Sequence, residues 1–214
     1  MANRLRVGLA VFLFAFVTVS AASADPATPS SLVSRFQAGL LETMRAAKVL
    51  GLQGRFRKLE PLIGQTFHLP LMVATAAAPF WRPAPVEHRR ALLAAFERMS
   101  VSTVATLFDD YGNETFEIVR ERATKGPTVL VDTRIVRPEK DPIEITYVTA
   151  RLRDRWWIID IIVGGGISEI KVRRGEYLSP LKQGGLPELT RKLSETAERL
   201  LTGGEKADPQ GAGG

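Results

Sequence analysis

The residues that could carry acid–base, nucleophilic or metal chemistry are few and widely spaced. His68 and His88 are the two histidines, and their separation matches no metal-ligand motif. No cysteine is present, which excludes thiol catalysis, thiolate metal ligands and disulfides. The chain also lacks a G-x-S-x-G nucleophile elbow and a P-loop. The sequence therefore predicts neither an enzyme nor a metal or cofactor site, and His68 is interpreted as a structural histidine.

Asp160 is the most prominent polar residue in an apolar run, because it separates Ile158-Ile159 from Ile161-Ile162. A carboxyl group in an apolar cavity has a raised pKa and could act as an acid. An outward strand residue paired with a neighbouring arginine would give the same pattern. An enzyme that uses Asp160 or Asp132 as general base, beside a polar group such as Tyr147, is therefore the alternative to a binding protein.

Short alternating runs separated by turn residues begin at Glu114 and predict β-structure. The connections between these runs are short enough to join antiparallel neighbours. We therefore expect a four-stranded antiparallel meander with strands over Thr115–Arg122, Thr128–Arg137, Ile143–Arg153 and Trp156–Val163.

Apolar residues recur at helical spacing on both sides of this stretch. Before the strands, the spacing predicts helices from about Ser31 to Gly51, around Phe56 to Ile63, and from about Pro85 to Asp110. After them we expect two helices, separated by Gly184-Gly185. The fold class is therefore α+β, with helices packed on one face of the sheet.

The alternation within the strands assigns the two faces of the sheet. One face of the second strand carries Val129, Val131, Thr133 and Ile135. One face of the fourth strand carries Trp157, Ile159, Ile161 and Val163. Asp132, Arg134 and Asp160 point the other way. The apolar face forms either a filled core or the wall of a cavity for an apolar ligand.

Residues 1 to 24 have the three parts of a secretory signal peptide. Two arginines give a positive start, and an apolar run follows from Val7 to Val19. Ala22-Ser23-Ala24 is a small-x-small cleavage site, so the mature chain is expected to begin at Asp25 in the periplasm. The apolar run is shorter than the roughly 20 residues that cross a bilayer, which favours cleavage over a retained anchor.

The remaining composition predicts one ordinary globular domain. The expected signal holds two of the 29 basic residues and none of the 23 acidic ones, so the mature chain has a formal charge of +4. Nucleic-acid binding needs clustered basic residues with stacking aromatics, and this charge is spread out. We expect a single domain over residues 25–201 and a disordered tail over 202–214, which is rich in glycine and charge.

Three segments, in their order and spacing, resemble the toluene-tolerance family of periplasmic lipid-binding proteins, the soluble shuttles of the Mla-type phospholipid pathway. They are FHLPLMVATAAAPFWRPAPVEHRRALLAAFERM (Phe67–Met99), WWIIDIIVGGGIS (Trp156–Ser168) and VRRGEYLSPLKQGGLPELTRKL (Val172–Leu193). The chain departs from the general pattern at Glu169-Ile170 and at Val172 to Tyr177. There it resembles the branch associated with hopanoid transport.

The resemblance implies an NTF2-like cone and a carrier that shuttles hopanoid or phospholipid between membrane-bound transport components. Its apolar cavity would hold the lipid tail between sheet and helices. Together with the alternation, it predicts lining residues on the sheet and on the helices: Val131, Ile135, Ile145, Ile159, Ile161, Phe67, Met72 and Phe96. A structural or chaperone-like protein with a filled core is a further interpretation.

Two arginines are the predicted docking residues. Arg173 and Arg174 lie at the start of a C-terminal helix and are expected to bind an acidic surface of a membrane transport component. A solvated basic face is the other interpretation of this pair.

Overall fold

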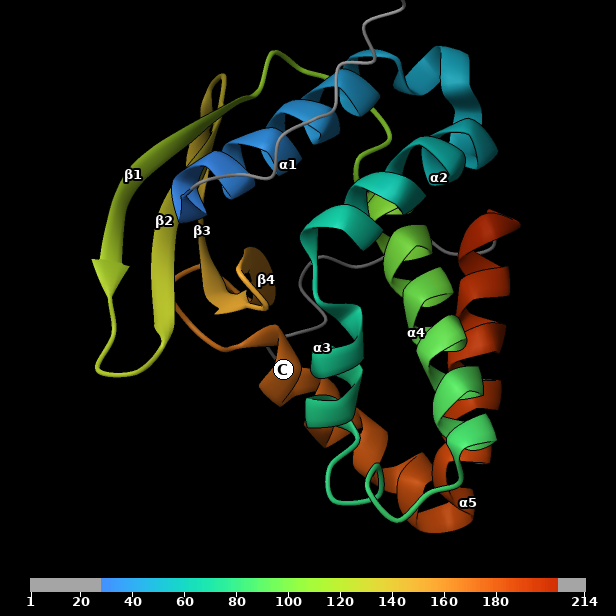
Figure 1. Ribbon diagram of the computed structural model, residues 1–214. Coiled ribbons are helices and arrows are strands. Elements are labelled where there is room, and N and C mark those ends of the chain that lie inside the picture. The colour runs from blue at the N-terminus through green and yellow to red at the C-terminus, as the bar shows by residue number, and fades with distance from the viewer. Residues whose placement is uncertain (1–27, 204–214) are drawn as a thin grey trace, which may run out of the picture.

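The computed structural model describes residues 28–203, which form helices, then a sheet, then one long helix (Figure 1). The helices are α1 (Pro29–Arg45), α2 (Ala47–Thr66), α3 (Leu69–Ala76), α4 (Val86–Leu107) and α5 (Glu169–Leu201). The strands are β1 (Thr115–Ala123), β2 (Thr128–Arg137), β3 (Lys140–Leu152) and β4 (Arg155–Val163). The predicted α+β class is confirmed.

The four strands form one antiparallel sheet in the order β1-β2-β3-β4, which is the predicted meander. Across its middle, Val131 lies opposite Tyr147, and Tyr147 lies opposite Ile161. We call the face that carries this row the inner face. Thr133 and Ile135 are buried on the same face, as the alternation in β2 predicts. On the opposite, outer face, the paired residues Arg134 and Glu144 are exposed.

A β-bulge in β4 changes which of its side chains face inward. Val148 of β3 lies opposite Asp160, whereas the next residue, Thr149, lies opposite Ile158. Ile159 is therefore the extra residue of the bulge, and the strict alternation predicted for β4 is wrong on one side of it. As a result Ile158, which sequence analysis did not select, is fully buried on the inner face.

Trp157 is the residue whose predicted side the bulge reverses. It pairs with Ala150, which lies three positions after Tyr147 in β3, so the side chains of Ala150 and Tyr147 leave opposite faces. The Arg155 guanidinium lies 4.1 Å from the centre of the indole ring. The edge of the His68 ring meets the same indole at a centroid distance of 5.3 Å. The prediction that Trp157 shares a face with Ile161 is therefore wrong.

The helices all lie to one side of the sheet, as predicted (Figure 1). α1 crosses the inner face and contacts β1, β2 and β4, while α3 and α5 contact β4. α2, α4 and α5 form a helical lobe beyond the sheet, in which α4 and α5 lie side by side. Arg98 and Glu198 join these two helices by an ion pair of 2.7 Å.

α1 forms where helix-start chemistry precedes a regular apolar spacing. Thr28 and Ser31 form a reciprocal capping box that satisfies the first backbone N–H groups. One side of α1 is buried at a spacing of four residues: Leu32, Phe36, Leu40 and Met44. The helix ends at Arg45, before the predicted stop. Gly51, with φ 58°, is instead a break inside α2, which continues through Pro61.

α5 is broken where the sequence predicts a boundary between two helices. Gly184 and Gly185 leave helical geometry, and the helix resumes at Pro187. Gly185 has φ 65° and ψ −153°, a backbone conformation that is essentially restricted to glycine. Among residues 28–203, no helix is long and apolar enough to cross a membrane.

Two glycine substitutions in α5 should change stability in opposite directions. Gly185→Ala should destabilise the protein by about 1–3 kcal/mol, because a Cβ is strained in that conformation. Gly175→Ala should stabilise it by about 0.5–1 kcal/mol, because Gly175 is mid-helix and an added methyl group meets nothing within 4 Å. Urea denaturation measures both. A Gly185→Ala variant as stable as the wild type would show that the break is not required.

Candidate functional site

An aromatic cluster at the middle of the inner face joins α1, β3 and the segment before α3. The Phe36 ring meets Phe67 edge-on at 5.0 Å and Tyr147 at 6.1 Å between centroids. Phe67 forms a β-bridge with Ile158, and the backbone N–H of His68 donates to the Ile158 carbonyl at 2.9 Å. The free edge of β4 is thereby tied to the helices. Edge-on aromatic pairs contribute about 0.5–1.5 kcal/mol beyond burial, so this cluster is a strong connection.

Six of the eight predicted lining residues belong to the apolar core that contains this cluster or pack against it, whereas Ile135 and Ile159 lie outside that core. The buried ones are Phe67, Met72, Phe96, Val131 and Ile135. Ile145 and Ile161 are half-buried and pack against the same region from the inner face. Ile159 is half-buried at the bulge and has no ladder position beside the others. Sequence analysis missed Ile158, because no sequence signal marks the bulge.

Few polar side chains interrupt this interior. Gln37 of α1 is 4% exposed, and its Nε2 has no hydrogen-bond partner within the described residues. The buried Tyr177 hydroxyl also has no hydrogen-bond partner among these residues. Burial raises the pKa of Tyr147 and of Tyr177, so both phenols stay neutral. No Asp or Glu of residues 28–203 is buried. The interior therefore lacks a carboxylate that could act as a base.

Asp160 caps α5 and does not face the interior. Its Oδ1 accepts hydrogen bonds from the backbone N–H of Ile161 at 2.8 Å and of Ile170 at 3.1 Å, and its Oδ2 accepts one from the Ser168 hydroxyl. Of the two sequence interpretations, the outward strand position is correct. Its hydrogen-bond partners, however, are the neighbouring Ile161 and groups at the N-terminus of α5, rather than an arginine. Asp160 thus connects β4 to the following helix.

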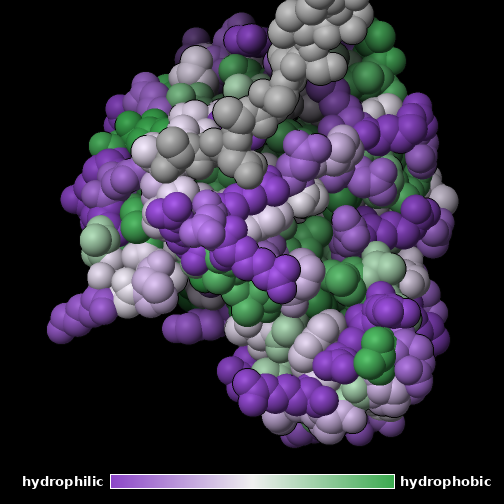
Figure 2. Space-filling view, viewed as in Figure 1, coloured by the Kyte–Doolittle hydropathy of each residue, from purple (hydrophilic) through white to green (hydrophobic). Residues whose placement is uncertain are grey.

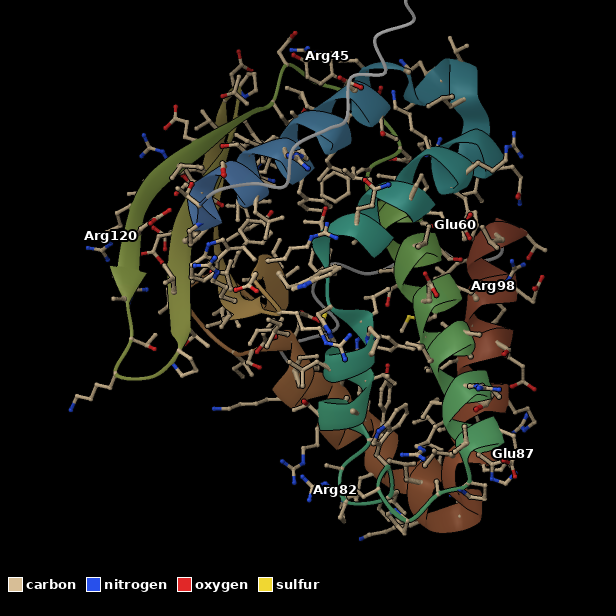
Figure 3. The ribbon with its side chains drawn as sticks, in the orientation of Figure 1. Arg45, Glu60, Arg82, Glu87, Arg98 and Arg120 are labelled. Carbon is tan, nitrogen blue, oxygen red and sulfur yellow. The ribbon has the colours of Figure 1, made fainter. Side chains whose placement is uncertain are left out.

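Asp132 is held on the outer face by arginines of the neighbouring strand. Arg122 donates two hydrogen bonds to it, at 2.7 and 2.8 Å, and Arg120 and Thr146 each donate one at 2.8 Å. These bonds, chiefly those of Arg122, hold the pKa of Asp132 well below its usual range. Figure 3 shows Arg120 on β1 at the edge of the molecule. Since Asp132 and Asp160 are both engaged elsewhere, neither can serve as a base beside Tyr147.

The histidines have no metal-binding arrangement. His68 caps α3, because its Nδ1 accepts the backbone N–H of Leu71 at 3.1 Å. Its structural role is therefore confirmed. His88 is half-buried in α4. Within the described chain no three metal-ligating side chains come together.

The two predicted docking arginines differ in their surroundings. Arg173 pairs with Glu176 at 3.1 Å and lies 3.9 Å from Glu169. Arg174 is exposed and forms no ion pair within residues 28–203. Arg174 is thus the member of the pair whose charge is available to a partner.

Surface hollows lie away from the apolar interior. One is at the β2–β3 turn, and another runs along the last turns of α5; both are lined mainly by polar and charged side chains, and neither includes a predicted lining residue. Figure 2 shows apolar side chains reaching the surface in the middle of its face, between the sheet and the lower end of the helices. Apolar side chains are therefore exposed on this face between these two parts.

Asp132→Asn should make the free energy of unfolding less dependent on pH in the acidic range. Because its pKa is lower in the folded state, Asp132 stabilises the fold fully above about pH 4, and this stabilisation is lost as the pH falls toward the folded-state pKa. The variant should be less stable than wild type at pH 7 and should lose less stability between about pH 4 and 2. Urea midpoints across this range test it, with the exposed Glu144→Gln as control. Parallel pH curves for wild type and Asp132→Asn would contradict it.

Comparison with known proteins identifies the family of this chain. A family model described as MlaC protein matches residues 34–195. Among solved structures, the chain is similar to a phospholipid-binding protein from Ralstonia solanacearum, determined in complex with a phospholipid. The two share 19% identity with a TM-score of 0.69, over 80% of this chain and 95% of the other. No curated protein matches the chain. The match over residues 34–195 shows that the chain belongs to the MlaC family.

Proposed function

We propose that this protein is a periplasmic lipid carrier that holds acyl chains between the inner face of the sheet and the helices. MlaC membership supports a role in phospholipid transport, and the similar Ralstonia protein binds a phospholipid. The observation that carries the proposal is the one-sided chemistry of the sheet. The inner face presents Val131, Tyr147 and Ile161, whereas the paired carboxylate Asp132 is kept on the outer face.

The physical requirement for such a carrier is a dry interior. Each methylene left in water costs roughly 0.8 kcal/mol, so an acyl chain of about 16 carbons lies about 13 kcal/mol above its membrane state. A carrier crosses an aqueous compartment only if it replaces most of this loss with apolar contacts. Ile145 and Ile161, which are half-buried at the rim of the apolar region, fit the entry side of such a cavity.

Phospholipid is the cargo that the similar structure supports, and hopanoid is the narrower alternative. The hopanoid alternative depends on the sequence differences from the general family pattern at Glu169-Ile170 and Val172 to Tyr177, which form the first turns of α5. Delivery between membrane-bound transport components, with Arg174 in docking, belongs to the same proposal. The expected signal peptide and its cleavage before Asp25 lie outside the described residues. Export is therefore proposed from the sequence and the family.

A lipid should accompany the protein when it is purified gently from the periplasm. Native mass spectrometry should detect a bound species with the mass of a phospholipid or a hopanoid, and competition between the two lipids should identify the preferred cargo. Failure to co-purify any lipid, together with no uptake from phospholipid vesicles, would reject the carrier.

Ile161→Trp should abolish lipid binding while the fold survives. The indole would occupy space required by the acyl chain, whereas in a permanently filled core the same change overpacks and costs about 1–3 kcal/mol. Ile162→Trp is the matched control, because Ile162 is the next residue along β4 and its side chain lies on the outer face, opposite Thr146. Lipid occupancy and urea midpoints are measured for both. Retention of lipid by Ile161→Trp would count against a cavity at this position.

A further inference from the structure

The lower end of the helical lobe carries a group of basic residues that the proposed lipid site does not use. This helical tip, residues 79–90, contains the loop between α3 and α4 and the first turn of α4. Figure 3 shows Arg82 and Glu87 there, at the far end of the molecule from Arg45 and Arg120. The tip projects beyond the sheet, at the end of the lobe where α5 also bends (Figure 1).

The charges of the helical tip are not neutralised within the protein. Arg82, Arg89 and Arg90 form no ion pair with any described residue, and Arg82 and Arg90 are exposed. Glu87 is the one acidic residue in the segment, and it lies in the first turn of α4, where it favours the helix dipole. The tip therefore presents a net positive charge, in contrast to Arg173, whose charge is shared with two glutamates.

An apolar residue lies among these arginines. Val86 is 51% exposed at the start of α4, and Arg89 and Arg90 follow it by three and four residues, which places all three on one side of the helix. Phe80 and Trp81 are half-buried beside Arg82 and pack against the core. Aromatic and apolar side chains flanked by arginine suit a membrane–water interface, where rings lie at headgroup depth and guanidinium groups bind phosphate.

The backbone of the tip favours a preformed surface. Pro79, Pro83 and Pro85 restrict φ through the loop, so little chain entropy is lost when the tip meets a partner. Such a preordered surface can meet a flat bilayer without rearranging.

We propose that the helical tip docks the protein on an anionic membrane surface. The basic side chains would bind lipid phosphates, and Val86 would insert at the headgroup boundary. This docking goes beyond lipid carriage, because it requires no occupied lipid cavity. It also places the contact with the membrane at the start of α4, apart from Arg173 and Arg174, whose predicted partner is a transport component.

Co-sedimentation of the purified protein with vesicles tests the proposal. One set of vesicles contains phosphatidylcholine alone and the other equal parts of phosphatidylcholine and phosphatidylglycerol. Wild-type protein should bind the anionic vesicles, release them at high salt, and bind the neutral vesicles weakly. Arg82→Glu/Arg90→Glu should weaken binding to anionic vesicles by roughly tenfold or more.

Matched variants separate docking at the tip from general charge. Lys171→Glu/Arg174→Glu makes the same change in charge at exposed positions of α5 and should keep binding within about twofold of wild type. Val86→Asp should weaken binding, whereas Val49→Asp, at a valine that is 92% exposed on α2, should not. Thermal melts confirm that each variant is folded.

Several results would overturn the proposal. These are equal binding of wild type to both vesicle types, no binding to anionic vesicles, unchanged binding of the tip variant, or an equal loss in the α5 variant. Binding of the tip to an acidic transport protein without any vesicle binding would assign the surface to that partner and also reject membrane docking. Lipid co-purification by the tip variant is scored separately, so loss of docking and loss of carriage are distinguishable.

Discussion

The covering of one apolar sheet face by α1 is the constraint on which the rest of the structure depends. The row Val131, Tyr147 and Ile161 cannot remain in water without a large hydrophobic cost. α1 covers it, with the Phe36 ring between Tyr147 and Phe67. Phe67 in turn bridges to β4, so the helical lobe and the sheet share one continuous core. The fold is thus a single body built around this contact.

The separation of charge between the two faces of the sheet follows from the same contact. A carboxylate on the inner face would require an internal partner, because burying an unpaired charge is very costly. Asp132 instead pairs with Arg120 and Arg122 on the outer face. Asp160 is also kept out of the interior, and it caps α5. An interior arranged in this way suits an apolar ligand and offers little to acid–base catalysis.

The helical lobe adds a second feature that the sheet alone does not require. The break at Gly184-Gly185 allows the two halves of α5 to follow different neighbours, since the first half meets β4 and α3 and the second lies along α4. This arrangement places the α3–α4 loop at the end of the lobe, away from the sheet. Arg82 and Val86 are therefore presented on a projection rather than absorbed into the core.

The sequence by itself determined the α+β class, the strand order of the meander, the inner face of β2 and the break in α5, because these depend on local periodicity and on glycine and proline. The tertiary structure decided what local patterns cannot encode. Cross-strand pairing created the bulge that turned Ile158 inward and Trp157 outward. The packing of α5 against β4 gave Asp160 a backbone partner at Ile170. Arg173 forms an ion pair with Glu176 of the same helix, whereas Arg82, at the end of the lobe, forms no ion pair with any described residue. Contacts between separate elements determined the bulge and the role of Asp160, whereas Arg173 pairs with a glutamate of its own helix.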